Sequence, residues 1–288
     1  MSLPAPETVV ERASDASTDG DVNVVVAGDV DTDSVERTDD GYVGETAGAV
    51  GRLAAGSAAG GTLHYPSPDF TAAGPWIVLA PLAGFVSTVA TGVGEATVVA
   101  ERETTSQPGR ESITDQLSAL LEAAQPTHEH YPVETDEQGV FTTGMTTFEL
   151  SSLVVEDELR ATFRVSTTPA TRPSDVTDRF ADVPGVERVD YETVVGVTRA
   201  DPSAALREAV EAAHREVRGD CEYEWLPDPG VFATIPGGEK LALGTGTPRA
   251  GAFSRAQYQT CVELLETTLS NVDPRSEVGS PSNAGSDT

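Results

Sequence analysis

Lysine is almost absent from this chain. Its 288 residues contain a single lysine, Lys240, and 18 basic residues stand against 47 acidic ones, for a formal net charge of -29. Proteins that bind nucleic acid need clustered lysine and arginine to contact the phosphates. The composition therefore argues against nucleic-acid binding, and no nucleic-acid partner is expected.

The acidic residues are spread along the whole chain rather than gathered in one tail. A surface of this charge repels itself at low ionic strength and needs salt to screen it. Acidic side chains in place of lysine also keep a protein soluble where water is scarce. The composition thus predicts a halophilic protein of the kind found inside halophilic archaea. The alternative, a disordered acidic segment or a surface for basic partners, fits the even distribution less well.

Cysteines and long apolar runs are also scarce. Cys221 and Cys261 match no zinc or redox spacing, which predicts buried thiols in a reducing cytoplasm. The longest apolar run, 76–93, is interrupted by proline, glycine, serine and threonine, so neither a membrane span nor a membrane partner is expected. The first residues lack a basic segment followed by an apolar one, as a secretion signal requires. These features favour a cytoplasmic location.

The two ends of the chain are polar, and residues 1–20 and the acidic tail 271–288 are expected to be disordered. The apolar runs 23–27 and 76–80 are typical of buried strands. Between them, the small residues of 46–59 fit a closely packed helix, although its glycines weaken that helix.

The middle of the chain has the order strand, helix, strand, strand, helix, strand, which is the split pattern of ferredoxin-like modules. The apolar periodicity predicts these six elements at 95–101, 113–124, 140–150, 158–166, 175–181 and 186–194. Such a module forms a four-stranded antiparallel sheet with two helices on one face.

After this module, Asp201-Pro202-Ser203 predicts the start of a helix that runs to about Val217. Short strands are expected at 222–225 and 241–243. A last helix is predicted at 254–269, where Ser-Arg-Ala-Gln has the form of a capping box.

The predicted fold class is therefore α/β, with one mixed-sheet domain interrupted by a second module. The interrupted domain comprises 21–92 and 200–270, and the ferredoxin-like module comprises 93–199. Strands and helices on both sides of the module are expected to share one sheet.

Several segments of the interrupted domain have the form of known metal-binding motifs. Gly28-Asp29-Val30-Asp31-Thr32 is similar to G-H-x-D-T, with Asp29 in place of the histidine. Residues 40–51 are similar to a following D-G…G-x-V-D-A-x-G segment without its aspartate, and 80–84 to G-E-P-S-G with Ala80 in place of the glutamate. Leu243 and the three residues after it are similar to Y-G-P-G.

In layout and in these segments the chain resembles the zinc-dependent ArgE/DapE-type amidohydrolases, especially the archaeal hydrolase that frees lysine or ornithine from an amino-group carrier protein. The resemblance extends into the middle module, which would be the lid of that family. There Thr104 lies where the lid histidine would be, and residues 158–169 look like a lid strand. The likeness covers about 21–270, in a shortened and degenerate form.

The resemblance implies two zinc ions held by His, Asp and Glu, with a glutamate as general base. Of the implied ligand positions, only Asp29 keeps a ligand-type side chain. Asp29 and Asp31 are thus remnant metal positions that could bind a hard cation, or else part of a solvated loop, which we favour. No cofactor is expected; zinc is the expected cofactor only if the chain is an active hydrolase.

Histidines are the other candidates for metal ligands. His128 and His130 could clasp a metal from an extended segment, but prolines on both sides favour an exposed connection. His64 is isolated. His214 lies in a helix rich in Arg and Glu, and this position predicts a solvated side chain.

Three functions remain open at this point. The first is a non-catalytic pseudoenzyme of the ArgE/DapE fold with a binding or regulatory role, forming a homodimer or pairing with an active homologue through the lid. The second is an active metal-dependent amidohydrolase that uses Asp29, Asp31 and His64 or His128 and releases an amino acid such as lysine or ornithine. The third is an unrelated two-part binding protein whose middle module recognises a small ligand. If the segments on either side of the module form no common sheet, the family resemblance would be a coincidence of composition.

Overall fold

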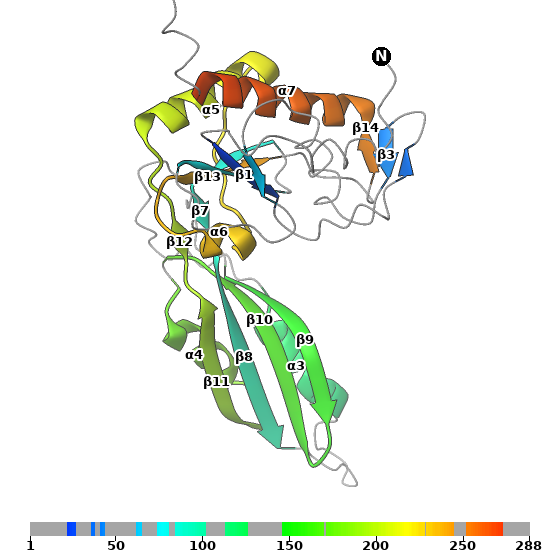
Figure 1. The fold of residues 1–288 in the computed structure, drawn as a ribbon. Coiled ribbons are helices and arrows are strands. Elements are labelled where there is room, and N and C mark those ends of the chain that lie inside the picture. Colours follow the sequence, from blue (N-terminus) through cyan, green and yellow to red (C-terminus); the bar gives the residue numbers. More distant parts are fainter. Residues whose placement is uncertain are drawn as a thin grey trace, which may run out of the picture. The chain divides into compact units, whose positions relative to one another are not determined.

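The structure is a computed structural model that describes residues 22–26, 36–37, 41–43, 62–64, 74–80, 84–101, 113–125, 146–169, 171–227, 229–244 and 252–272. It divides into two compact units (Figure 1). The first unit comprises 1–86, 200–222 and 234–288, and the second comprises 87–199 and 223–233. Each unit is described separately below.

The centre of the first unit is a five-stranded sheet in the order β4-β1-β5-β13-β6. Its strands are β4 (Thr62–His64), β1 (Asn23–Val26), β5 (Trp76–Ala80), β13 (Lys240–Gly244) and β6 (Val86–Ser87). The pairs β4–β1, β1–β5 and β5–β13 are all parallel. All residues of β1, β5 and β13 are buried, which explains their nearly continuous apolar sequences.

This sheet joins segments from both sides of the middle module. Strand β5 precedes the module and β13 follows it, and the two pair directly from Lys240↔Trp76 to Gly244↔Ala80. Segments from both sides of the module therefore share one sheet, as expected, and the result that would have made the family resemblance a coincidence is not found.

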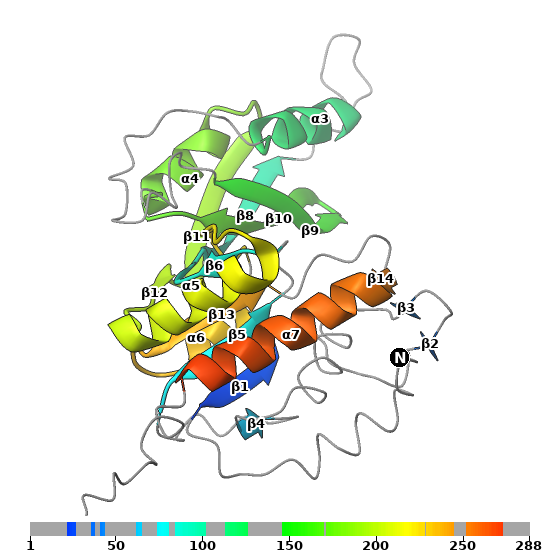
Figure 2. The same cartoon turned by 90° about the horizontal axis from the view of Figure 1, so that it is seen from above.

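Two helices, α5 (Ala204–Arg218) and α7 (Arg255–Val272), pack against each other over one face of this sheet (Figures 1 and 2). The side chain of Ser203 accepts a hydrogen bond from the backbone of Leu206, so the predicted start of α5 is confirmed. The predicted capping box of α7 is also present. Ser254 Oγ accepts from the backbone N–H of Gln257 at 3.2 Å, and Gln257 Oε1 accepts from that of Ser254 at 2.9 Å.

A small sheet and short elements complete the described chain. Strands β14 (Ala252–Ser254), β3 (Gly41–Val43) and β2 (Glu36–Arg37) form an antiparallel sheet. Strands β7 (Val89–Ala90) and β12 (Thr198–Arg199) pair, and α6 (Gly230–Thr234) is a single helical turn that the sequence did not predict.

The second unit contains a four-stranded antiparallel sheet in the order β11-β8-β10-β9. In chain order its elements are β8, α3, β9, β10, α4 and β11, the β-α-β-β-α-β order that the sequence predicts. Their bounds are Gly92–Glu101, Ile113–Ala123, Thr147–Val155, Glu158–Thr167, Pro173–Ala181 and Val186–Val195. Helices α3 and α4 lie on the same face of the sheet (Figures 1 and 2).

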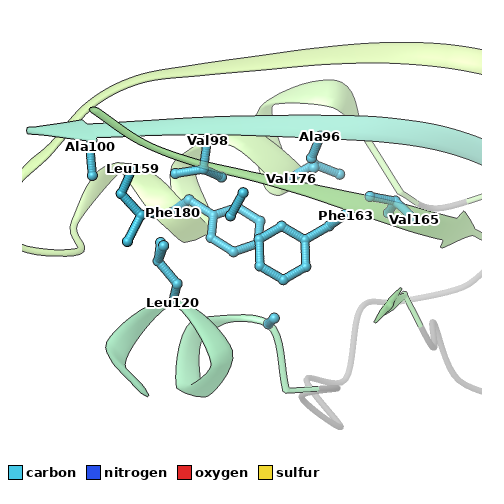
Figure 3. Packing of buried hydrophobic residues seen from close by; sticks show 11 residues of the cluster. Ala96, Val98, Ala100, Leu120, Leu159, Phe163, Val165, Val176 and Phe180 are labelled. Carbon is cyan, nitrogen blue, oxygen red and sulfur yellow. The ribbon is translucent and has the colours of Figure 1, made fainter. Parts of the chain in front are cut away.

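The core of this unit lies between the sheet and the two helices (Figure 3). Phe180 of α4 stacks on Phe163 of β10 with ring centroids 5.0 Å apart, and Phe148 of β9 meets Phe180 edge to face at 5.5 Å. Leu120 of α3 closes the other side of the cluster. Alternate residues of β10 are therefore buried, as expected for a strand with one covered face.

Two predicted elements differ from the structure, and a third lies outside the described residues. Residues 222–225 form no strand; isolated bridges at Tyr223 and Leu226 are found instead, the second of them to Ala90. Strand β9 continues through Val155, five residues beyond the end predicted at residue 150. The helix predicted at 46–59 lies outside the described residues.

No helix in the described part of the chain is long and apolar enough to span a membrane.

Candidate functional site

The carboxyl ends of four parallel strands meet at one edge of the five-stranded sheet, here called the carboxyl edge. Strand β4 ends at His64, β1 at Val26, β5 at Ala80 and β13 at Gly244. The register places His64 beside Val25 and Gly244 beside Ala80. Ligands of open α/β sheets bind outside the carboxyl ends of the strands, so this edge is the candidate site.

Two of the four strand ends carry no group that could hold a metal. Ala80 is 1% exposed at the end of the central strand β5, and Gly244 follows it in register. A methyl group and a hydrogen atom offer no lone pair to a cation. The ends of β5 and β13 therefore supply no ligand for a zinc ion, which requires nitrogen, sulfur or oxygen ligands.

The structure describes only one of the six candidate site residues. The backbone of His64 lies at the carboxyl edge as the last residue of β4. Asp29, Asp31, Thr104, His128 and His130 lie outside the described residues, and they remain predictions. Within the described ranges, no three His, Cys, Asp or Glu side chains come close enough together to hold a metal ion.

Sequence reasoning missed an arginine beside this edge. The guanidinium of Arg218, the last residue of α5, lies over Gly84, where a β-carbon would overlap it. Gly84 has a φ of +95°, a conformation that favours glycine. The signal available in the sequence was the four-residue spacing between His214 and Arg218, which places both on one side of a helix.

The prediction that His214 is solvated is wrong. Its side chain is fully buried, and neither ring nitrogen has a hydrogen-bond partner among the described residues. Burial, reinforced by the positive charge of Arg218 and opposed by Asp220, lowers the pKa of His214 to about 4. Helix α5 packs against α7, and His214 lies on the covered side, so it is neutral at physiological pH.

Of the remaining reactive groups, Cys261 and Lys240 are buried, whereas Cys221 is half-buried and so only partly fits the predicted burial of both thiols. Burial raises the pKa of the Cys261 thiol to about 12 and that of the half-buried Cys221 to about 11, so both are unreactive free thiols. Lys240 is 2% exposed, and its ammonium donates to the carbonyl of Ile235 at 2.5 Å. Burial lowers the pKa of this lysine. The one lysine of the chain is thus internal, and the protein has no lysine on its surface.

No protein-family model matches the chain, and no curated protein matches it. Solved structures do match. Human carnosine dipeptidase 1 has a TM-score of 0.56 at 10% identity, covering 89% of this chain and 81% of its own. The dipeptidase Dug1p from Saccharomyces cerevisiae has a TM-score of 0.56 at 9% identity, with the same coverage. The M20 family metallo-carboxypeptidase Sso-CP2 from Sulfolobus solfataricus has a TM-score of 0.51 at 10% identity, covering 89% and 86%.

These similarities establish the fold. The chain has the mixed α/β architecture of M20-type metallopeptidases, with several sheets and an interrupted central domain. The predicted α/β fold class is confirmed, and the likeness to metallopeptidases holds for the fold.

Proposed function

We propose that this protein is a non-catalytic member of the metallopeptidase fold that acts by binding. The observation that carries the proposal is Ala80. It is buried at the carboxyl end of the central strand, in a segment similar to a metal motif whose ligand is glutamate. An amidohydrolase of the ArgE/DapE type needs metal ions to activate water and polarise the scissile carbonyl. The ends of β5 and β13, Ala80 and Gly244, supply no such ligand.

We further propose that the four-stranded unit is the lid module and that it pairs two chains. Strand β9 is the outermost strand of the described sheet, next to β10. Residues 150–155 of this strand, Leu-Ser-Ser-Leu-Val-Val, contain neither a charge nor a proline. Leu153, Val154 and Val155 are 39%, 46% and 40% exposed. Edge strands with free backbone groups and exposed apolar side chains pair readily with other strands.

The opposite edge of the same sheet differs in charge. Strand β11 carries four charged residues, Glu187, Arg188, Asp190 and Glu192, and all four are exposed. Charges on an edge strand oppose pairing with another chain. Two copies of this strongly acidic chain repel each other. They can therefore approach with the lowest electrostatic cost at an uncharged edge. Pairing of β9 with β9 of a second copy, across a two-fold axis, satisfies this condition.

The change Val154→Lys tests this pairing. It adds a charge to the exposed edge without altering the buried core, so we expect the dimer dissociation constant to rise at least about tenfold, equivalent to about 1.4 kcal/mol. Sedimentation equilibrium of the full chain in multimolar KCl measures this dissociation constant. The matched control is Val194→Lys, which places the same charge on β11 at a side chain that is 64% exposed. A monomeric wild-type protein, or equal weakening by both variants, would contradict pairing through β9.

An active hydrolase with a relocated metal site is the second candidate, because the backbone of His64 lies at the carboxyl edge. This candidate uses Asp29 and Asp31 together with His64 or His128. Hydrolysis of N-acetylated lysine, ornithine or arginine in the presence of added zinc would support it. We expect no zinc-dependent turnover, and turnover that is lost in His64→Ala would replace the non-catalytic proposal.

A further inference from the structure

The position of Arg218 in the first unit follows from two backbone hydrogen bonds near the end of α5. The amide of Gly244, at the end of β13, donates to the carbonyl of Phe85 at 2.9 Å. The amide of Val86 donates to the carbonyl of Glu222 at 2.9 Å, just beyond the end of α5. These two bonds place the segment 84–86 between the carboxyl edge and the end of α5. Arg218, whose guanidinium lies over Gly84, is therefore beside the carboxyl edge.

The guanidinium of Arg218 also has no counter-ion among the described residues. It forms no ion pair and no hydrogen bond there, although acidic residues outnumber basic ones by 47 to 18 in the chain. Asp220, two residues away, is close enough to act on the charge of His214 but forms no ion pair with Arg218. By contrast, Arg215 on the same helix is held by Glu211 at 2.6 Å.

We propose that Arg218, held over Gly84, binds the carboxylate of a small molecule at the carboxyl edge. A guanidinium presents two parallel N–H donors that match the two oxygens of a carboxylate, and such a pair is stronger than a neutral hydrogen bond. Arg218 is an exposed residue, and because Gly84 lacks a side chain its guanidinium lies directly against the backbone there. This site lies in the first unit and does not depend on pairing through β9.

His214 supplies a reporter for this site. It lies one helical turn before Arg218, is fully buried, and senses the charge of that arginine. An anion bound to the guanidinium offsets part of this charge and changes the electric field at the imidazole. The ring resonances of His214 should therefore move when a carboxylate binds, and a His214→Gln variant assigns them among the four histidines of the chain.

The experiment replaces KCl by potassium acetate at constant potassium concentration and neutral pH, and follows the ring resonances of His214 by NMR. We expect a saturable shift in the wild-type protein and its loss in Arg218→Gln. The matched control is Arg215→Gln, which removes the same charge from an exposed arginine on the same helix and should retain the saturable shift.

Three results would overturn the proposal. A shift that stays linear with acetate in every protein would show a general effect of the salt. Equal losses in the two arginine variants would show that net charge, not Arg218, governs binding. A saturable response to inorganic phosphate with none to acetate would assign the site to a different oxyanion.

Discussion

At the scale of single residues, the close packing around Gly94 in the second unit predicts that a larger side chain there lowers stability. Gly94 of β8 lies beside the ring of Tyr191 in β11, and a β-carbon at this position would overlap that ring. The ring packs against the core and cannot move freely. We expect Gly94→Ala to lower the free energy of unfolding by about 1–3 kcal/mol, as overpacking does. Urea unfolding in KCl measures this change.

Gly196→Ala is the matched control for that change. Nothing lies within 4 Å of the position that its β-carbon would take, and the residue belongs to the same unit. The control should be neutral or slightly stabilising, because alanine restricts the unfolded chain more than glycine does. Equal destabilisation by both variants would contradict the packing of Tyr191 over Gly94.

His214 predicts a dependence of stability on pH. The imidazole titrates near 6.5 in the unfolded chain and at about 4 in the folded one, so the unfolded state binds more protons between these values. The contribution of neutral His214 is complete above pH 6.5 and is lost as the pH falls towards 4, by up to about 3 kcal/mol. His214→Leu should gain this amount relative to the wild type over that range. If the difference in unfolding free energy between the wild type and His214→Leu stays constant with pH, the imidazole is not buried in its neutral form.

At the scale of elements, the start of α5 depends on one serine. Ser203 Oγ accepts from the backbone of Leu206 at 3.2 Å, and its own N–H and hydroxyl contact the carboxylate of Glu239 at 2.8 and 2.6 Å. We expect Ser203→Ala to cost about 1 kcal/mol of unfolding free energy, measured in the same urea experiment. Ser174→Ala, near the start of α4, removes a hydroxyl that bonds to no described residue and should change little. A neutral Ser203→Ala would show that this cap does not stabilise α5.

The sequence predicts the helices and strands better than the site, because helix caps and apolar runs depend on residues that are close together in the chain. The capping residues Ser203, Ser254 and Gln257 act within three residues of themselves, so their pattern is visible in sequence. The apolar runs of β1 and β5 likewise reflect burial on both faces of a parallel sheet. Strand ends and turns depend on partners elsewhere, which is why β9 extends further than predicted.

The site residues required contacts that no local pattern contains. Gly84 and Arg218 are far apart in the chain and meet only because α5 ends beside the segment after β5. His214 looked solvated because its neighbours in sequence are charged, whereas the packing of α7 buries it. The apolar run 76–80 did predict correctly that a strand ends at Ala80.

At the scale of the whole molecule, stability should depend on salt. The net charge is -29, and the only lysine is buried, so acidic groups dominate the surface. Lowering the ionic strength from about 1 M to 0.1 M lengthens the screening distance from about 3 to 10 Å, and repulsion between these groups grows. We expect the melting temperature, measured by calorimetry, to fall steadily as KCl is withdrawn. Sucrose at equal osmolality should not restore it, and full restoration by sucrose would argue against charge repulsion as the cause.

The central claim, that this metallopeptidase fold is non-catalytic, is tested most directly by zinc binding. The measurement is the zinc content and zinc affinity of the full chain in multimolar KCl, with an intact hydrolase of the same fold as a positive control. The account predicts no bound zinc after purification and no uptake at micromolar zinc, because Ala80 and Gly244 at the carboxyl edge offer no ligands. Near-stoichiometric, tightly bound zinc would contradict it and identify the protein as a metal-dependent hydrolase candidate.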